Sequence, residues 1–166
     1  MNSAAITDHG VMLVSLTFTR LRRQQVSTQS LAVRCTWHRS RFDREAAYGE
    51  DRYYHLVLLA ENNEGYQNLM KIVSKGFVDG YYYKPRVDME VLQQYHSGII
   101  ALSACLAGEV QRYLVKGLYD EAKKVAEKYE NCFGKGNFFL GITGSWNPGA
   151  ADGQSTACAD EPGDRH

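Results

Sequence analysis

The middle of the chain alternates between continuous apolar runs and segments whose apolar residues recur at helical spacing. The stretch YYHLVLLA is almost continuously apolar, which is typical of a strand buried on both faces and predicts a strand over His55–Ala60. The following segment has apolar residues at helical spacing, which predicts a helix over Glu64–Lys75 with Asn62 or Asn63 as its N-cap. The apolar run SGIIALSAC then predicts a second buried strand over Ile99–Leu102.

Further helices are indicated before and after this second strand. Asp88 can cap a short helix in MEVLQQY, and GEVQRYLVKG is typical of a helix that ends at Gly117. The pattern of YDEAKKVAEKYENCFG predicts a longer helix over Asp120–Cys132, ended by Gly134, and NFFL predicts a third strand over Asn137–Leu140. Strands that alternate with helices predict an α/β fold with mainly parallel pairing.

Two segments do not fit this pattern. Leu13–His38 has β-type residues and a basic cluster without a clean period, and we hypothesise a strand around Leu13–Thr19 followed by a loose connection. Gly141–His166 is rich in glycine, alanine, aspartate and proline. It has too few large apolar side chains to offset the entropy of ordering, so we expect a disordered tail.

Composition narrows the class of protein without naming a function. The 166 residues suffice for one domain, and 19 basic residues balance 19 acidic ones, so a strongly basic nucleic-acid footprint is absent. No apolar run reaches membrane-spanning length and the N-terminus does not resemble a signal peptide, so no membrane partner is expected. The cysteines are scattered without a C-x-x-C spacing, which predicts reduced thiols and a cytoplasmic location. They are Cys35, Cys105, Cys132 and Cys158.

The stretch AAITDHG holds the first candidate for chemistry. Its apolar run ends in Asp8 and His9, followed by Gly10. Ligands of α/β proteins gather at the carboxyl ends of strands. An Asp-His pair there is consistent with part of a metal or phosphate site, which needs further residues.

Other candidates have a simpler alternative beside the functional one. YYYKPR, Tyr81–Arg86, could stack on or neutralise a nucleic acid, and a structural loop is the alternative. TRLRR, Thr19–Arg23, could bind phosphates but lies in a segment that fits no pattern. We expect His96 to be exposed, and the closeness of Cys35 and His38 in sequence carries no argument.

Several motifs together resemble one family. YHLVLLA, YYKPRVD and LSACLAGEV, in this order, resemble the polymerase-and-histidinol-phosphatase (PHP) domain at the N-terminus of bacterial replicative DNA polymerase III alpha subunits, and AITDHGVM resembles an earlier motif of that domain. The matching blocks are Ala4–Met12 and Arg39–Leu140. The resemblance implies an incomplete, distorted (β/α) barrel, with residues 1–140 as a partial PHP domain and 141–166 as a tail.

The family pattern has a helix and a strand with a G-C-E motif where this chain has residues 13–38. Permitted codons for Val14–His38, read one base earlier, give GVIDFYKAAAATGINPIIGCEVYVA, which contains the missing helix, strand and motif. Deleting one base at Gly141 similarly gives ELQDHGIPEQRTVNQQLVRMSQETG. Both peptides resemble the family, which predicts that residues 13–38 and 141–166 are out of frame.

The resemblance implies metal ligands at four positions. His9, His55 and Cys105 match ligand positions of the family, and Asp8 matches a ligand or a residue that orients one. This donor set suits zinc or manganese, which in the family supports metal-assisted phosphoester hydrolysis such as 3′–5′ exonuclease activity. The resemblance also implies that the H-x-H strand, later Asp and His ligands and the polymerase palm lie outside this chain. With strands missing or replaced, we do not expect His9 to be held beside His55.

Three hypotheses for function follow. The first is an inactive fragment of a replicative polymerase alpha subunit, whose family is a DNA-directed DNA polymerase with DNA and other replicative subunits as partners. The second is a surviving metal-dependent phosphoesterase or 3′–5′ exonuclease. The third is a non-catalytic scaffold that braces a polymerase. Whether the chain itself is an enzyme stays open at this point.

Overall fold

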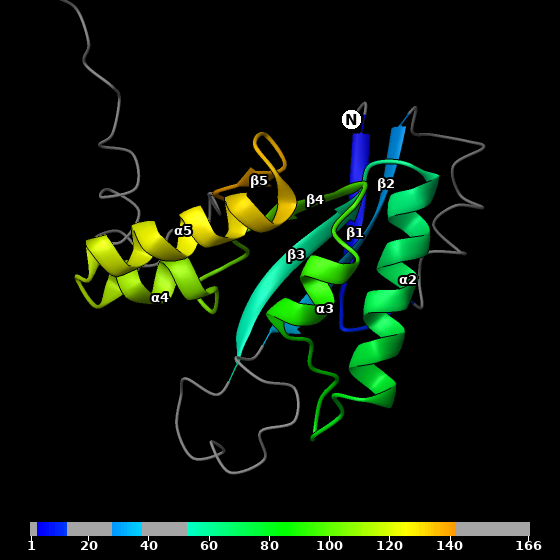
Figure 1. Cartoon of the computed structure of the whole chain (residues 1–166), viewed down its shortest axis with the longest axis horizontal. Helices are drawn as coiled ribbons and strands as arrows, with labels where there is room; N and C mark the ends of the chain where they lie inside the picture. Colours follow the sequence, from blue (N-terminus) through cyan, green and yellow to red (C-terminus); the bar gives the residue numbers. More distant parts are fainter. Residues whose placement is uncertain (1–2, 13–27, 38–52, 142–166) are drawn as a thin grey trace, which may run out of the picture.

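The computed structural model describes residues 3–12, 28–37 and 53–141. Its centre is a five-stranded sheet whose strands lie side by side in chain order (Figure 1). The strands are β1 (Ser3–His9), β2 (Thr28–Trp37), β3 (Tyr54–Ala60), β4 (Ile99–Leu102) and β5 (Phe138–Phe139). The sheet is open, and with its helices it confirms the α/β class.

The pairing of the strands is mixed, so the expectation of mainly parallel pairing is wrong. β1–β2 and β4–β5 are parallel, whereas β2–β3 and β3–β4 are antiparallel. The chain between β3 and β4 explains the second antiparallel pair, because Glu61 N donates to Gly98 O at 2.9 Å. β4 therefore begins beside the end of β3. The chain leaves this end along α2 and returns to it through α3, so β4 runs opposite to β3.

The helices begin and end close to the predicted positions. They are α2 (Asn63–Val78), α3 (Met89–Gln94), α4 (Glu109–Val115) and α5 (Tyr119–Phe133). Asn62 is the N-cap of α2, and its side chain accepts a hydrogen bond from Gly65 N at 2.9 Å. Asp88 caps α3 by accepting from Val91 N at 3.2 Å. These side chains satisfy backbone N–H groups that the first turn of a helix leaves unpaired.

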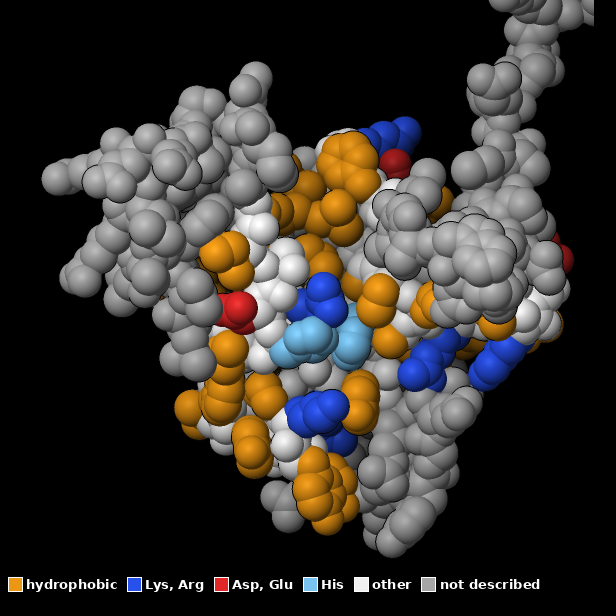
Figure 2. Space-filling view, turned by 180° about the vertical axis from the view of Figure 1, so that it is seen from behind, with side chains coloured by type: hydrophobic (Ala, Val, Ile, Leu, Met, Phe, Trp, Pro, Cys, Tyr) orange, Lys and Arg blue, Asp and Glu red, His pale blue; other side chains and the backbone are white. Residues whose placement is uncertain are grey.

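The core lies on the face of the sheet that α2 and α3 cover, with α4 and α5 packed against each other near β4 and β5 (Figure 1). Successive side chains of a strand point to opposite faces. Leu56 and Leu58 of β3 and Val33 of β2 thus point toward α2, where Leu69 and Ile72 are also fully buried. The other face carries the alternate residues, among them His55, and Figure 2 shows it.

β2 lies in a segment for which the sequence predicted neither the family's helix nor its strand. We predicted no second strand in this segment, but Thr28–Trp37 forms a strand of ten residues. Its buried Val33 and Cys35 alternate with Arg34, the period of two that a strand requires. The hypothetical strand Leu13–Thr19 lies outside the described residues. So does the tail after Gly141, and its disorder stays a prediction. No helix in the described part of the chain is long and apolar enough to span a membrane.

Candidate functional site

The sheet brings together two histidines that are far apart in sequence. His9 is the last residue of β1 and His55 is the second residue of β3, with β2 between them. Their ring centroids are 5.2 Å apart. Figure 2 shows His side chains, in pale blue, gathered near the centre of this face. The expectation that they would not be held together is wrong, because β2 pairs with both strands and fixes their spacing.

The register of β2 puts a third side chain on the same face. His9 pairs with Arg34, and His55 pairs with Thr36, two residues further along β2. Residues two apart on a strand share a face. We call the face that carries His9, Arg34 and His55 the histidine face. Asp8 pairs with the buried Val33, so alternation directs its side chain to the opposite face from His9.

Cys105 approaches His55 from the turn between β4 and α4. Its Sγ lies 3.6 Å from His55 Nδ1. Backbone hydrogen bonds hold this turn, since His55 N donates to Ala107 O at 2.9 Å and Gly108 N donates to Cys105 O at 2.7 Å. Ala104, directly before Cys105, has a φ of 65°, which costs a non-glycine residue about 1–3 kcal/mol. The strained backbone of Ala104 therefore lies next to the contact between the Cys105 thiol and the His55 imidazole.

Helix α5 supports this turn through α4. Tyr129 OH donates to Glu109 Oε2 at 2.8 Å, and both side chains are buried. Glu109 is the first residue of α4, directly after the turn that holds Cys105 and contacts the backbone of His55. The Tyr129 ring also stacks on Phe138 of β5, with centroids 5.2 Å apart. These contacts tie the position of Cys105 to the packing of the two C-terminal helices.

Cations surround the two histidines. Arg34 Nη1 lies 3.1 Å from His9 Nε2. Burial is the largest cause that lowers the pKa of His9, followed by the charges of Arg34 and Lys84. Burial also lowers the pKa of His55, followed by the charges of His9, Arg34, Lys84 and Arg112. Lys and Arg side chains lie close to the histidines in Figure 2. Both imidazoles are thus biased toward the neutral form.

The donor set, as it stands, does not fit a metal ion. A metal site needs three or more ligands that converge on one point, with an open position for catalysis. Among the described residues, no group of three or more His, Cys, Asp and Glu side chains is placed to share an ion. His9 and His55 are adjacent and Cys105 lies beside His55, but the atom that contacts His9 Nε2, at 3.1 Å, is a nitrogen of Arg34.

The loop YYYKPR is partly structural. Arg86 is buried, donates from Nε to Gly80 O at 3.3 Å and lies over the Tyr82 ring. Lys84 Nζ donates to Tyr53 OH at 3.1 Å. Tyr83 remains exposed. The contacts of Arg86 with Gly80 and Tyr82 therefore stabilise the loop itself. The charge of Lys84 acts on His9 and His55.

The remaining predicted candidates contribute little to a site. His96 is near the surface, and its Nδ1 lies 2.7 Å from Gln93 O. Cys35 is buried in the core, and burial raises the pKa of its thiol to about 12, so it is unreactive at neutral pH. His38 and the TRLRR segment lie outside the described residues.

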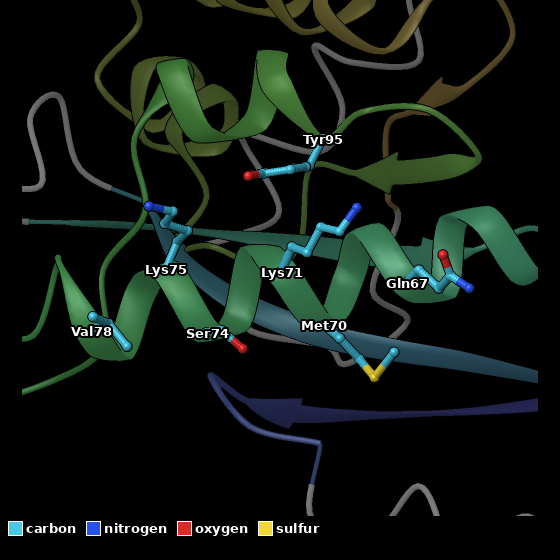
Figure 3. A pocket seen from close by; sticks show the side chains of 7 residues that line it. All are labelled: Gln67, Met70, Lys71, Ser74, Lys75, Val78 and Tyr95. Carbon is cyan, nitrogen blue, oxygen red and sulfur yellow. The ribbon is translucent and has the colours of Figure 1, made fainter.

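A separate groove of about 540 Å³ lies along α2 (Figure 3). All of its lining residues except Tyr95, the C-cap of α3, come from α2. Lys71 Nζ is 5.4 Å from the centroid of the Tyr95 ring, and Met70 is partly exposed at the rim. The lining residues are Gln67, Met70, Lys71, Ser74, Lys75, Val78 and Tyr95. The groove combines no nucleophile with a base or metal ligand, so the histidine face is the better candidate for chemistry.

Arg34 is the site residue that sequence reasoning missed. It lies in the segment without a clear pattern, and its role depends on a register that local sequence does not specify. One signal was present, because the glutamate of the G-C-E motif in the alternative reading falls at position 34. Comparing the two readings position by position would have identified an arginine in place of an acidic residue.

Comparison with known proteins identifies the family of the region that contains the histidine face. A family profile described as "PHP domain" matches residues 1–145. DNA polymerase III subunit alpha of Treponema pallidum (strain Nichols) is 42% identical over 143 residues, covering 83% of this chain and 12% of that protein. The subunit of Deinococcus radiodurans is 49% identical over 104 residues, covering 62% and 8%. That of Helicobacter pylori (strain ATCC 700392 / 26695) is 35% identical over 153 residues, covering 86% and 12%. The chain spans about a tenth of the length of these relatives.

Proposed function

This chain belongs to the PHP domain family, and from that premise we propose that it is a catalytically inactive PHP module of a bacterial replicative DNA polymerase alpha subunit. The relatives that carry this name support the parent protein, and the resemblance of the quoted motifs to the N-terminal domain agrees with them. DNA, other replicative subunits and a cytoplasmic location belong to the proposal, since they concern the much longer relatives.

One observation carries the proposed inactivity. Hydrolysis of a phosphodiester by this family requires clustered metals that activate water and clamp the substrate. In the described part of the chain, no three His, Cys, Asp and Glu side chains converge on one point. We propose that zinc or manganese fills the site of the intact domain, and that His9, His55, Cys105 and Asp8 do not bind it here with full occupancy.

The proposed domain division follows from the same comparison of readings. Residues 1–140 form a partial PHP domain in which 13–38 are out of frame, and 141–166 form an out-of-frame tail. In the alternative reading, the glutamate of G-C-E stands at the position of Arg34. Sequencing the gene through codons 12–39 and 139–142 tests it, and codons that exclude both alternative readings would refute it.

A second function has one observation in its favour. The rings of His9 and His55 are adjacent and Cys105 Sγ lies 3.6 Å from His55 Nδ1, which supports the proposal that these residues belong to a phosphoesterase site. A surviving 3′–5′ exonuclease would use these residues. The scaffold hypothesis requires no ligand and is compatible with the inactive module.

The decisive experiment is digestion of a 3′-labelled single strand with manganese or zinc added. We expect the 166-residue protein to release no more label than its His55→Ala variant, and to extend no primer. Digestion that disappears in His55→Ala would show a working nuclease site and would refute the proposed inactivity. Circular dichroism of both proteins confirms that they are compared in the folded state.

A further inference from the structure

The strand between the two histidines carries a cation where a metal site would carry a ligand. β2 pairs with β1 on one side and β3 on the other, and its register places Arg34 opposite His9. Thr36, two residues away on the same face, is opposite His55. A side chain at position 34 is therefore directed to the region that both imidazoles border.

The contact between Arg34 and His9 uses the atom that a metal would need. Arg34 Nη1 lies 3.1 Å from His9 Nε2. A guanidinium has only donors, so Nε2 accepts this bond through its lone pair and the ring proton lies on Nδ1. Metals bind neutral imidazole through the same kind of unprotonated nitrogen. A hydrogen bond from Arg34 and a metal at Nε2 therefore exclude each other.

The charges around the site strengthen this exclusion. A guanidinium stays protonated at every pH at which the protein folds. The charges of Arg34 and Lys84 act on both histidines, and the charge of Arg112 acts on His55. A dication that approaches the pair meets these fixed positive charges.

Arg34 itself is poorly accommodated. Its Nε is buried, and among the described residues it has no hydrogen-bond partner. A buried donor without a partner loses its hydration without compensation. Replacing Arg34 by a shorter side chain therefore removes an unsatisfied group, and we expect the fold to tolerate the change.

We propose that the guanidinium of Arg34 takes the place of a metal ion in this domain and prevents the remaining donors from binding one. The inference rests on the proposed function, because it gives the physical cause of the inactivity. Charge reversal by Arg34→Glu would add a carboxylate to His9, His55 and Cys105. Imidazole, carboxylate and thiolate form a donor set that zinc accepts.

The alternative reading agrees with the same exchange. The glutamate of its G-C-E motif falls at position 34, where this chain has arginine. The hydrogen bond to His9 is the observation that carries the proposal, and the alternative reading is a hypothesis that sequencing of the gene can test.

The experiment compares zinc binding by the full chain and three variants. Equilibrium dialysis measures the zinc bound, and cobalt(II) absorption reports whether a thiolate is a ligand. We expect Arg34→Glu to bind one zinc at least about tenfold more tightly than the unaltered protein. We expect this gain to disappear in Arg34→Glu/His55→Ala, which separates the site from cysteines and histidines elsewhere in the chain.

Arg34→Gln is the matched control, because it removes the charge without supplying a strong ligand. We expect it to bind zinc more tightly than the unaltered protein and less tightly than Arg34→Glu. If Arg34→Glu does not fold, the test rests on Arg34→Gln and on the nitrogen-15 NMR spectrum of the histidine rings in the unaltered protein. In that spectrum we expect the His9 proton on Nδ1, and a proton on Nε2 would overturn the proposal.

Two further outcomes would overturn it. One is stoichiometric, His55-dependent zinc binding by the unaltered protein, and the other is a folded Arg34→Glu variant that binds zinc no better. The proposed function fails separately, through His55-dependent digestion of DNA. Zinc binding by the unaltered protein without digestion would refute only the role of Arg34.

Discussion

Replacing Tyr129 by phenylalanine tests how the C-terminal helices hold the candidate site. Tyr129 is 2% exposed and donates to Glu109 Oε2 at 2.8 Å, and Glu109 is 5% exposed. Tyr129→Phe keeps the ring that stacks on Phe138 and removes only the hydroxyl. The carboxylate of Glu109 then loses this donor in a place where water cannot replace it.

The magnitude follows from the kind of bond that is lost. Hydrogen bonds to charged groups contribute about 1.5–3 kcal/mol. We expect the free energy of unfolding to fall by about 2 kcal/mol. For a chain of this size, this corresponds to a Tm lower by roughly 4–8 °C.

Urea denaturation followed by circular dichroism measures this difference. Tyr83→Phe is the matched control, because Tyr83 is 78% exposed, and we expect it to change stability by less than about 0.5 kcal/mol. A Tyr129→Phe variant as stable as Tyr83→Phe would refute the view that the bond to Glu109 braces α4. An altered denaturant slope would instead indicate a change in the unfolded or native ensemble.

The same residue predicts a pH dependence. Burial, and then the charge of Glu109, raises the pKa of Tyr129 above its usual value of about 10. The folded state therefore keeps the phenol proton of Tyr129 at a pH where the unfolded state loses it. The free energy of unfolding is unaffected by this group below about pH 10 and falls as the pH rises further. We expect the unaltered protein to lose more stability than Tyr129→Phe between about pH 9 and pH 11. Equal losses in the two proteins would contradict this.

Three other predictions concern local packing and reactivity. Gly65→Ala should strongly destabilise the protein in thermal melts, because a Cβ at this position would lie 1.8 Å from Gly98 O, and an unchanged Tm would contradict the packing of α2 against the start of β4. Asp88→Ala should cost about 1 kcal/mol in urea denaturation through loss of the α3 cap, and no loss would argue against this bond. Iodoacetamide at about pH 8 should modify the half-buried Cys105 before Cys35, because burial raises the pKa of the Cys35 thiol to about 12. Peptide mapping that finds Cys35 modified first would contradict the burial of Cys35 in the core.

Local pattern predicted the central elements because each one carries its own signal. The strands His55–Ala60 and Ile99–Leu102 and the helix Asp120–Cys132 are confirmed within a few residues. Their apolar positions recur with the period of one element, and their ends carry caps or glycine. Elements of this kind are recognisable without knowledge of what they pack against.

The site depends on contacts that no local pattern encodes. His9, His55 and Cys105 were recognised as candidates, but the closeness of the histidines follows from the register of β2, a strand that the sequence did not predict. Arg34 acquires its position from the same register. Both the assembly of the histidine pair and the cation beside it are therefore properties of strand pairing, which local sequence does not specify.

The open sheet has a consequence for self-association. β1 lies at one end of the described strand order, with β2 as its neighbour there. The free side of an edge strand can template the addition of another chain, and proteins discourage this with lysine, proline or closure into a barrel. The β1 sequence SAAITDH contains neither lysine nor proline. Among the described strands, β1 is therefore one where a second copy of the chain could add a strand at high protein concentration, and the oligomers formed in this way would compete with the monomer.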